Sequence, residues 1–189
     1  FKHLPQDIMT KLKHPPTEEF EPRDMIPAPG TVKEGAFVIQ GGKVYVKEGN
    51  VLEPRSYGPK VTGRIKGMVA LRDAALGHIH LQLEGASDAA IKNSEKALNR
   101  LYDKFVKKHG YLHDNPNQRA FSDDPDFHFV MSLERDYTPA KDGKPASAEK
   151  AAIFSKRTMP KQEEITSVDT IEEALTVTLN QRGCVDIPH

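Results

Sequence analysis

The sequence predicts an α+β fold, and three observations support this class. Two short runs of alternating apolar residues flank Gly41-Gly42, which is typical of a β-hairpin. Residues 64–109 carry apolar positions at helical spacing with a break at 85–87, which indicates two antiparallel helices. A further helical pattern covers about residues 170–182. We therefore expect a small β-meander, a helical hairpin and a C-terminal helix, with long irregular segments between them.

The predicted β-meander covers residues 36–54. Two strands at 36–40 and 43–47 are followed by a possible third at 51–54. A sheet of this size is marginal by itself, so it needs a helix to pack on. Residues 1–34, by contrast, hold six of the fourteen prolines. Proline removes a hydrogen-bond donor and favours extended backbone before it, which predicts a proline-rich arm or linker.

The first predicted helix covers residues 64–84 and carries a charge inside its apolar face. That face comprises Ile65, Met68, Val69, Leu76, Ile79 and Leu83. Arg72 falls in the middle of it, and a buried charge has to be paired or has to serve a site. We expect a salt bridge to a neighbour such as Glu95 or Asp103. Residues 78–83 also alternate with period two, so a strand there remains an alternative.

The second predicted helix has two faces of opposite character. It begins at the N-cap candidate Ser87 and ends near Lys108, before Gly110. Its apolar face comprises Ile91, Leu98, Leu101, Tyr102 and Phe105. The opposite face carries five basic residues, interrupted by Asp103 alone: Lys92, Lys96, Arg100, Lys104 and Lys107. Such a row is either a solvated surface or a contact for an anionic partner.

Global charge gives no argument for a nucleic-acid or membrane partner, because 27 basic residues balance 27 acidic ones. Local charge is less even. Residues 35–110 carry a net charge of +6, and residues 111–189 carry −5. A local patch matters more than the average for binding a polyanion. The negative half also offers an internal partner for the basic row.

The later part of the chain is harder to assign. Residues 111–160 are predicted to be loop-rich, with a strand or helical turn at 127–133 and a polar loop at 139–149. Asp169 or Thr170 would cap the helix at about 170–182. We expect residues 35–189 to form one irregular domain. The chain begins with Phe1 and stops at His189 just after a helical pattern, which suggests a piece of a longer protein.

No catalytic, cofactor or metal signature is recognisable in the sequence. The single cysteine, Cys184, excludes an intrachain disulfide, and no apolar run is long enough to span a bilayer. His78 and His80 share a face only on a strand, so a metal site there is disfavoured. Three neighbouring acids, Asp123, Asp124 and Asp126, are best explained by turn chemistry and solvation.

Several separated blocks resemble one family of very large proteins from phages, plasmids and conjugative elements. These proteins join an adenine-type DNA methyltransferase to a Swi/Snf-like superfamily 2 helicase. The similar blocks are residues 64–73, 98–110, 117–121, 124–126, 152–157, 167–180 and 183–186.

The resemblance places this chain between the methyltransferase and helicase modules, as a connecting domain. It implies a cytoplasmic DNA-processing protein whose other modules bind ATP with Mg²⁺ and S-adenosylmethionine. None of the similar blocks is a catalytic motif, so no enzymatic activity and no cofactor is assigned to this chain.

Two hypotheses follow. In the first, a non-catalytic connecting domain contacts DNA through Lys92, Lys96, Arg100, Lys104 and Lys107, with Lys156 and Arg157 adding to the contact. In the second, the chain is a structural spacer or protein-docking module without nucleic-acid contact. A free-standing enzyme would require a site that the sequence does not contain.

Overall fold

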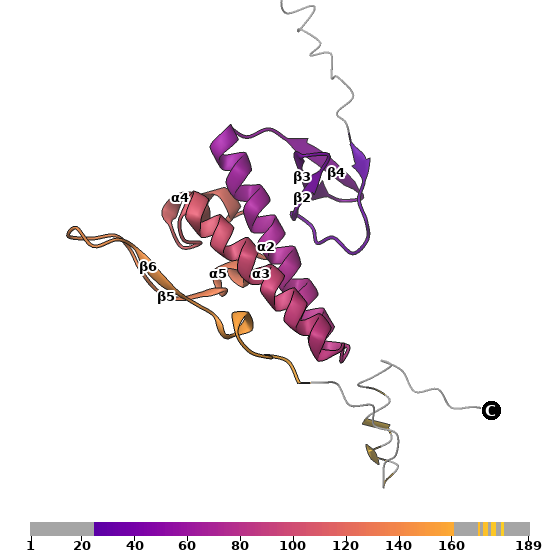
Figure 1. Cartoon of the computed structure of the whole chain (residues 1–189). Helices are drawn as coiled ribbons and strands as arrows, with labels where there is room; N and C mark the ends of the chain where they lie inside the picture. Colours follow the sequence, from indigo (N-terminus) through magenta and orange to yellow (C-terminus); the bar gives the residue numbers. More distant parts are fainter. Residues whose placement is uncertain (1–24, 161–169, 171, 174, 177–178, 180–189) are drawn as a thin grey trace, which may run out of the picture.

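The structure is a computed structural model that describes residues 25–160, 170, 172–173, 175–176 and 179. It confirms the α+β class, with an antiparallel sheet, a helical hairpin and further short helices (Figure 1). In the described residues, no helix is long and apolar enough to cross a membrane.

The first sheet has four antiparallel strands in the order β1-β4-β3-β2. The strands are β1 (Ile26–Pro27), β2 (Phe37–Gln40), β3 (Lys43–Glu48) and β4 (Val51–Arg55). Gly41 and Gly42 both have positive φ, at 54° and 76°, and they join β2 to β3 in the predicted two-residue turn.

The boundary expected at residue 34 is wrong. Strand β1 pairs with β4, with Ile26 opposite Leu52, so the chain joins the sheet before residue 34. The prolines by themselves indicate a linker. An edge strand tolerates proline, however, because one of its sides forms no hydrogen bonds to a neighbouring strand. Residues 1–24 lie outside the described part of the chain.

Helix α2 (Pro59–Leu83) is the centre of the fold. It packs along α3 (Asp88–His109), against β2 and β3, and against the short helices α4 (Asn115–Phe121) and α5 (Phe127–Met131). Figure 1 shows α2 and α3 side by side, with the sheet beside one end of α2. The helix begins five residues before the predicted start, with Pro59 in its first turn, a position where proline fits well.

The buried face of α2 differs from the predicted one. Ile65, Met68 and Val69 are buried as expected, but Leu76 and Leu83 are each 40% exposed. Besides Arg72, which was predicted on this face, the core side includes Leu71, Ala75, His78 and Gln82. Polar residues occupy these places because each of them finds a hydrogen-bond partner, which apolar periodicity cannot indicate.

Arg72 is buried and paired, but not with either predicted partner. Its Nη1 lies 2.7 Å from Asp124 Oδ2, its Nη2 donates to the Phe37 carbonyl oxygen, and its Nε lies 2.9 Å from Asp73. Asp124 also accepts from the backbone N–H of Phe37 and from that of Asp126. The bond to the Asp126 N–H is the predicted turn chemistry. The expected solvation holds for the exposed Asp123 but is wrong for Asp124, whose side chain is fully buried, and for Asp126, which is buried too.

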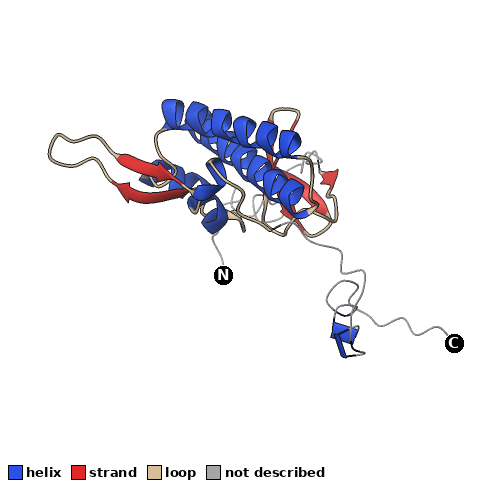
Figure 2. Ribbon diagram, turned by 60° about the horizontal axis from the view of Figure 1, so that its bottom comes forward, coloured by secondary structure: helices blue, strands red, loops and turns tan. Residues whose placement is uncertain are grey.

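Residues 111–160 hold more regular structure than expected. Besides α4 and α5, they contain a second sheet of β5 (Glu134–Thr138) and β6 (Ser147–Lys150), followed by the short helix η1 (Ala152–Phe154). The β5–β6 hairpin projects from the helices (Figure 2). Long-range contacts order this segment: Glu134 accepts from four donors, including Tyr102 Oη on α3 at 2.9 Å.

The predicted C-terminal helix lies mostly outside the described residues. The described positions 172–173, 175–176 and 179 are helical, and Thr170 Oγ1 accepts from the backbone N–H of Glu173 as an N-cap does. Leu175 and Leu179, two of its predicted apolar positions, are each 46% exposed.

The hydrogen bonds of buried His78 fix its protonation state. Gln82 Oε1 accepts from the backbone N–H groups of Thr158 and Met159, so Gln82 Nε2 faces His78 Nε2 at 2.7 Å and donates to it. His78 Nδ1 then donates to Ser94 Oγ, which itself donates to a carbonyl. His78 is therefore neutral, and burial lowers its pKa against the opposing attraction of Glu95.

We expect acid to destabilise the fold through His78. Below the ordinary pKa of 6.5, His78 binds a proton in the unfolded chain but stays neutral in the folded chain. This contribution to stability is therefore complete above pH 6.5 and is lost as the pH falls toward the lower folded pKa. Urea unfolding between about pH 7 and about pH 5 should show a shallower pH dependence in His78→Asn than in the parent chain. An unchanged dependence would contradict this assignment, and the matched control is His80→Asn, since His80 is exposed.

Candidate functional site on the helical hairpin

Helix α3 carries the predicted basic face, and its ends follow from the local sequence. Ser87 Oγ accepts from the Ala90 backbone N–H at 3.3 Å, and Gly110 adopts a φ of 82° after the last turn. These are the expected N-cap and C-terminal stop. Ile91, Leu98, Tyr102 and Phe105 are buried, so the opposite side of the helix faces outward.

All five residues of the basic row are exposed: Lys92, Lys96, Arg100, Lys104 and Lys107. Within the described part of the chain, none of them forms an ion pair. The acidic residues of 111–160 therefore do not neutralise the row. From its first to its last residue the row spans about 22 Å along the helix.

Asp103, the acidic interruption of the row, is itself neutralised. Lys150 Nζ lies 2.6 Å from Asp103 Oδ1 and donates to Asn99 Oδ1 at 2.8 Å. The same ammonium lies 5.1 Å from the centroid of the Tyr102 ring. Three contacts thus hold Lys150 on this edge of α3, and Asp103 subtracts little from the positive potential of the row.

Lys156 and Arg157 differ in what they have available for a ligand. Lys156 is exposed and forms no ion pair with another described residue. Arg157, in contrast, donates through Nη2 to the Gln82 carbonyl oxygen at 2.5 Å and through Nε to the Met159 carbonyl oxygen at 2.8 Å. These hydrogen bonds of the guanidinium connect the segment after η1 to the last turn of α2, which is a structural role.

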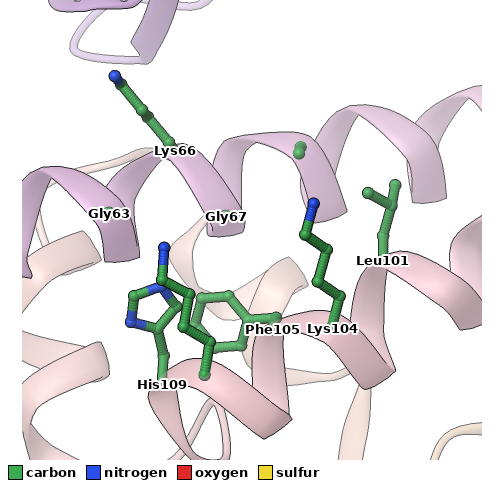
Figure 3. Close-up of a pocket in the computed structure, with 9 residues that line it drawn as sticks. Gly63, Lys66, Gly67, Leu101, Lys104, Phe105 and His109 are labelled. Carbon is green, nitrogen blue, oxygen red and sulfur yellow. The ribbon is translucent and has the colours of Figure 1, made fainter.

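A hollow between α2 and α3 gathers further basic residues that periodicity in the sequence did not single out. This hairpin hollow has a cavity volume of about 230 Å³ and is drawn in Figure 3. Its lining comprises Gly63, Lys66, Gly67, Ala70, Leu101, Lys104, Phe105, Lys108 and His109. No acidic side chain is part of that lining.

Two glycines of α2 leave room for ring side chains of α3 beside the hollow. A Cβ at Gly67 would lie 2.5 Å from the Phe105 ring, and one at Gly63 would lie 3.2 Å from the His109 ring. In Figure 3 the rings of Phe105 and His109 lie side by side below α2, and the Lys104 side chain rises toward α2. Lys66 points away from the two rings, so its stem rather than its ammonium lines the hollow.

A second hollow adjoins the first and extends its positive charge. It shares Gly63, Lys108 and His109 with the hairpin hollow and adds Pro59, Lys60 and Arg64. The pKa of His109 is lowered by burial and by the nearby charges of Lys108 and Arg64. Both effects disfavour the protonated, charged form of His109. An anion bound in the hollow would offset them by favouring that form.

Other clusters of polar residues are explained by structure. His78 and His80 lie on a helix rather than a strand, with His78 buried and His80 paired with Glu84. Asn117 lies in α4, where it accepts from Arg64 Nε and donates to the Tyr111 carbonyl oxygen. Among the described residues, no group of histidine, cysteine or acidic side chains is arranged to hold a metal ion.

The fold and this surface define an α+β domain with a basic helical hairpin. Comparisons with protein-family models, with curated proteins and with solved structures find no match to this chain.

Proposed function

We propose that this chain is a non-catalytic connecting domain that contacts DNA within a larger, cytoplasmic DNA-processing protein of a bacterium or phage. The observation that supports the contact is the basic row of α3, which is exposed and free of ion pairs among the described residues. The resemblance to methyltransferase–helicase proteins suggests the parent. Its methyltransferase and helicase modules would flank this domain and would bind S-adenosylmethionine, ATP and Mg²⁺.

The basic row suits the phosphate backbone better than the base edges. Lysine is a point charge on a flexible stem, and four of the five residues are lysines. Lys92, Lys96, Arg100 and Lys104 follow one another at intervals of four residues, or about 6 Å along the helix axis. Contacts of this kind position a duplex without reading its sequence. We therefore propose non-specific binding.

The 189-residue chain should bind a labelled DNA duplex with a dissociation constant of about 1 to 100 μM near physiological salt. If all five residues contact phosphates, log K should fall with log salt with a slope of about −4.5, because each contact releases counterions. Lys96→Glu/Arg100→Glu/Lys104→Glu should abolish binding. Fluorescence anisotropy from about 50 mM to about 200 mM salt measures both effects.

The control variant Arg119→Glu/Lys141→Glu/Lys144→Glu carries the same charge change outside the helices α2 and α3. All three side chains are exposed, and no ion pair involves them among the described residues. It should keep most of the affinity and of the salt slope. Equal loss in both variants would mean attraction by overall charge rather than a contact at α3. A folded chain that binds no duplex even at low salt would refute the DNA contact.

The alternative is a spacer or protein-docking module, and one observation favours it. Leu76 and Leu83 are seven residues apart on α2, and each is 40% exposed. Exposed apolar side chains at helical spacing suit contact with another protein surface. In that case the basic row would face acidic surfaces of the flanking modules. Absence of duplex binding by the folded chain would leave this alternative ahead.

A further inference from the structure

The hairpin hollow combines an apolar floor with a basic rim. Gly67, Ala70, Leu101 and Phe105 supply the floor. Lys104, Lys108 and His109 supply the rim, and the adjoining hollow adds Lys60 and Arg64. The site thus offers two kinds of surface, one for an apolar or planar group and one for an anion. This arrangement, with few polar groups beside an apolar wall, is typical of sites for small ligands.

The cations of this region lack the acidic partners that other cations of the chain have. Arg72 pairs with Asp124, Lys150 with Asp103, and Lys33 with Asp126. Lys60, Lys104 and Lys108 form no ion pair with any described residue. Like charges held together without counter-charge repel one another, and a bound anion removes that repulsion.

The cavity volume limits the size of the ligand. Pockets for drug-sized ligands measure about 300 to 1,000 Å³, and the hairpin hollow, at about 230 Å³, falls below that range. A single phosphate that carries one sugar and one base fits this limit better than a larger molecule. Phe105 is buried, so the half-buried side chains of Ala70 and Leu101 provide the surface on which a planar ring would lie. Lys104, Lys108 and His109 provide donors for the phosphate.

We propose that the hairpin hollow binds one nucleotide unit, with the phosphate on Lys104, Lys108 and His109 and the base against Ala70 and Leu101. The source is either a free nucleoside monophosphate or one nucleotide of a nucleic-acid strand. This inference goes beyond the proposed duplex contact, because only Lys104 belongs to both sets of residues. Binding in the hollow can therefore hold whether or not the basic row contacts DNA.

His109 supplies a direct readout. Proton NMR of the 189-residue chain, titrated with deoxyadenosine monophosphate at constant ionic strength, should show saturable shifts of the His109 ring protons. Because the phosphate offsets the charges of Lys108 and Arg64, the pKa of His109 should rise on binding. Inorganic phosphate should bind about tenfold more weakly, because it does not use the apolar floor.

Two variants with the same loss of charge test the location. Lys104→Gln/Lys108→Gln should weaken nucleotide binding at least about tenfold, whereas Lys141→Gln/Lys144→Gln, at exposed positions outside α2 and α3, should leave it unchanged. Their folding is checked by thermal unfolding. Equal weakening in both, or shifts that do not saturate, would overturn the proposal. Inorganic phosphate binding as tightly as the nucleotide would overturn the assignment of the base to the floor.

A competition arm distinguishes the two sources. If a single-stranded oligonucleotide displaces the monophosphate at His109, the hollow accepts a nucleotide of a strand. If it leaves the His109 shifts unchanged, the hollow accepts only the free nucleotide. The duplex assay on Lys96→Glu/Arg100→Glu/Lys104→Glu and this assay on Lys104→Gln/Lys108→Gln use different ligands, so failure of one proposal is separable from failure of the other.

Discussion

Asp124→Ala should destabilise the fold by about 3 to 5 kcal/mol, the usual cost of removing one partner from a buried ion pair. The carboxylate is fully buried, and its loss leaves Arg72 with a buried, poorly compensated charge. It also removes the acceptor for the backbone N–H of Phe37 on β2. Because this carboxylate joins β2, α2 and the segment between α4 and α5, its loss loosens all three together.

Urea unfolding measures the effect, and two further variants interpret it. Asp123→Ala, at an exposed neighbour, should change the free energy of unfolding by less than about 0.5 kcal/mol. The loss of unfolding free energy in Arg72→Met/Asp124→Leu should be smaller than the sum of the losses in Arg72→Met and in Asp124→Leu, because no uncompensated charge stays buried in the double variant. Additivity of the two single changes, or a cost for Asp124→Ala as small as that for Asp123→Ala, would show that the pair does not hold these elements.

Glu134→Ala is expected to have the second largest effect, a loss of at least about 3 kcal/mol. Glu134 Oε1 accepts from Tyr102 Oη and from the Leu112 backbone N–H at 2.8 Å, and Oε2 accepts from two donors of His113. A buried donor left without its acceptor costs about 1 to 3 kcal/mol. Burial and the adjacent carboxylate raise the pKa of Tyr102, so this hydroxyl stays a donor at neutral pH.

Hydrogen exchange locates the effect and unfolding measures its size. In Glu134→Ala the backbone amides of Leu112 and His113 should exchange faster than they do in the parent chain. The exchange of amides in the Gly41-Gly42 hairpin, which is remote in the chain, should accelerate less. Glu149→Ala provides the control on the same small sheet, because Glu149 is exposed and its nearest contact to Arg135 is 3.7 Å. Uniform acceleration across the chain would mean global destabilisation, and unchanged exchange at Leu112 would contradict the role of Glu134.

Features that depend on neighbouring residues were predictable from the sequence. The β2–β3 hairpin follows from Gly41-Gly42, whose positive φ values only glycine adopts readily. The length of α3 follows from Ser87 at its start and Gly110 after its end. The outward face of α3 follows from the spacing of its apolar residues, which is why the basic row is exposed as predicted.

Features that join distant residues were not predictable in this way. Arg72 finds Asp124 at a separation of 52 residues, although Glu95 and Asp103 were nearer in sequence. The helices and strands of residues 111–150 are short, and contacts such as that between Glu134 and Tyr102 stabilise them more than their own propensities do. The hairpin hollow was not predicted either. It lies where residues of two helices meet at glycines, and glycines do not contribute to a pattern of apolar side chains.

Local sequence patterns were enough to predict the α+β class, the two-residue turn, the helical hairpin and the face on which the basic row lies. These depend on backbone geometry and side-chain period within one element, and both are properties of adjacent residues. Which charges are buried, which acid neutralises which base and where α2 and α3 leave space between them became clear from the folded structure. Those outcomes depend on the packing of elements far apart in the chain, where the cost of an unpaired buried group selects the partner.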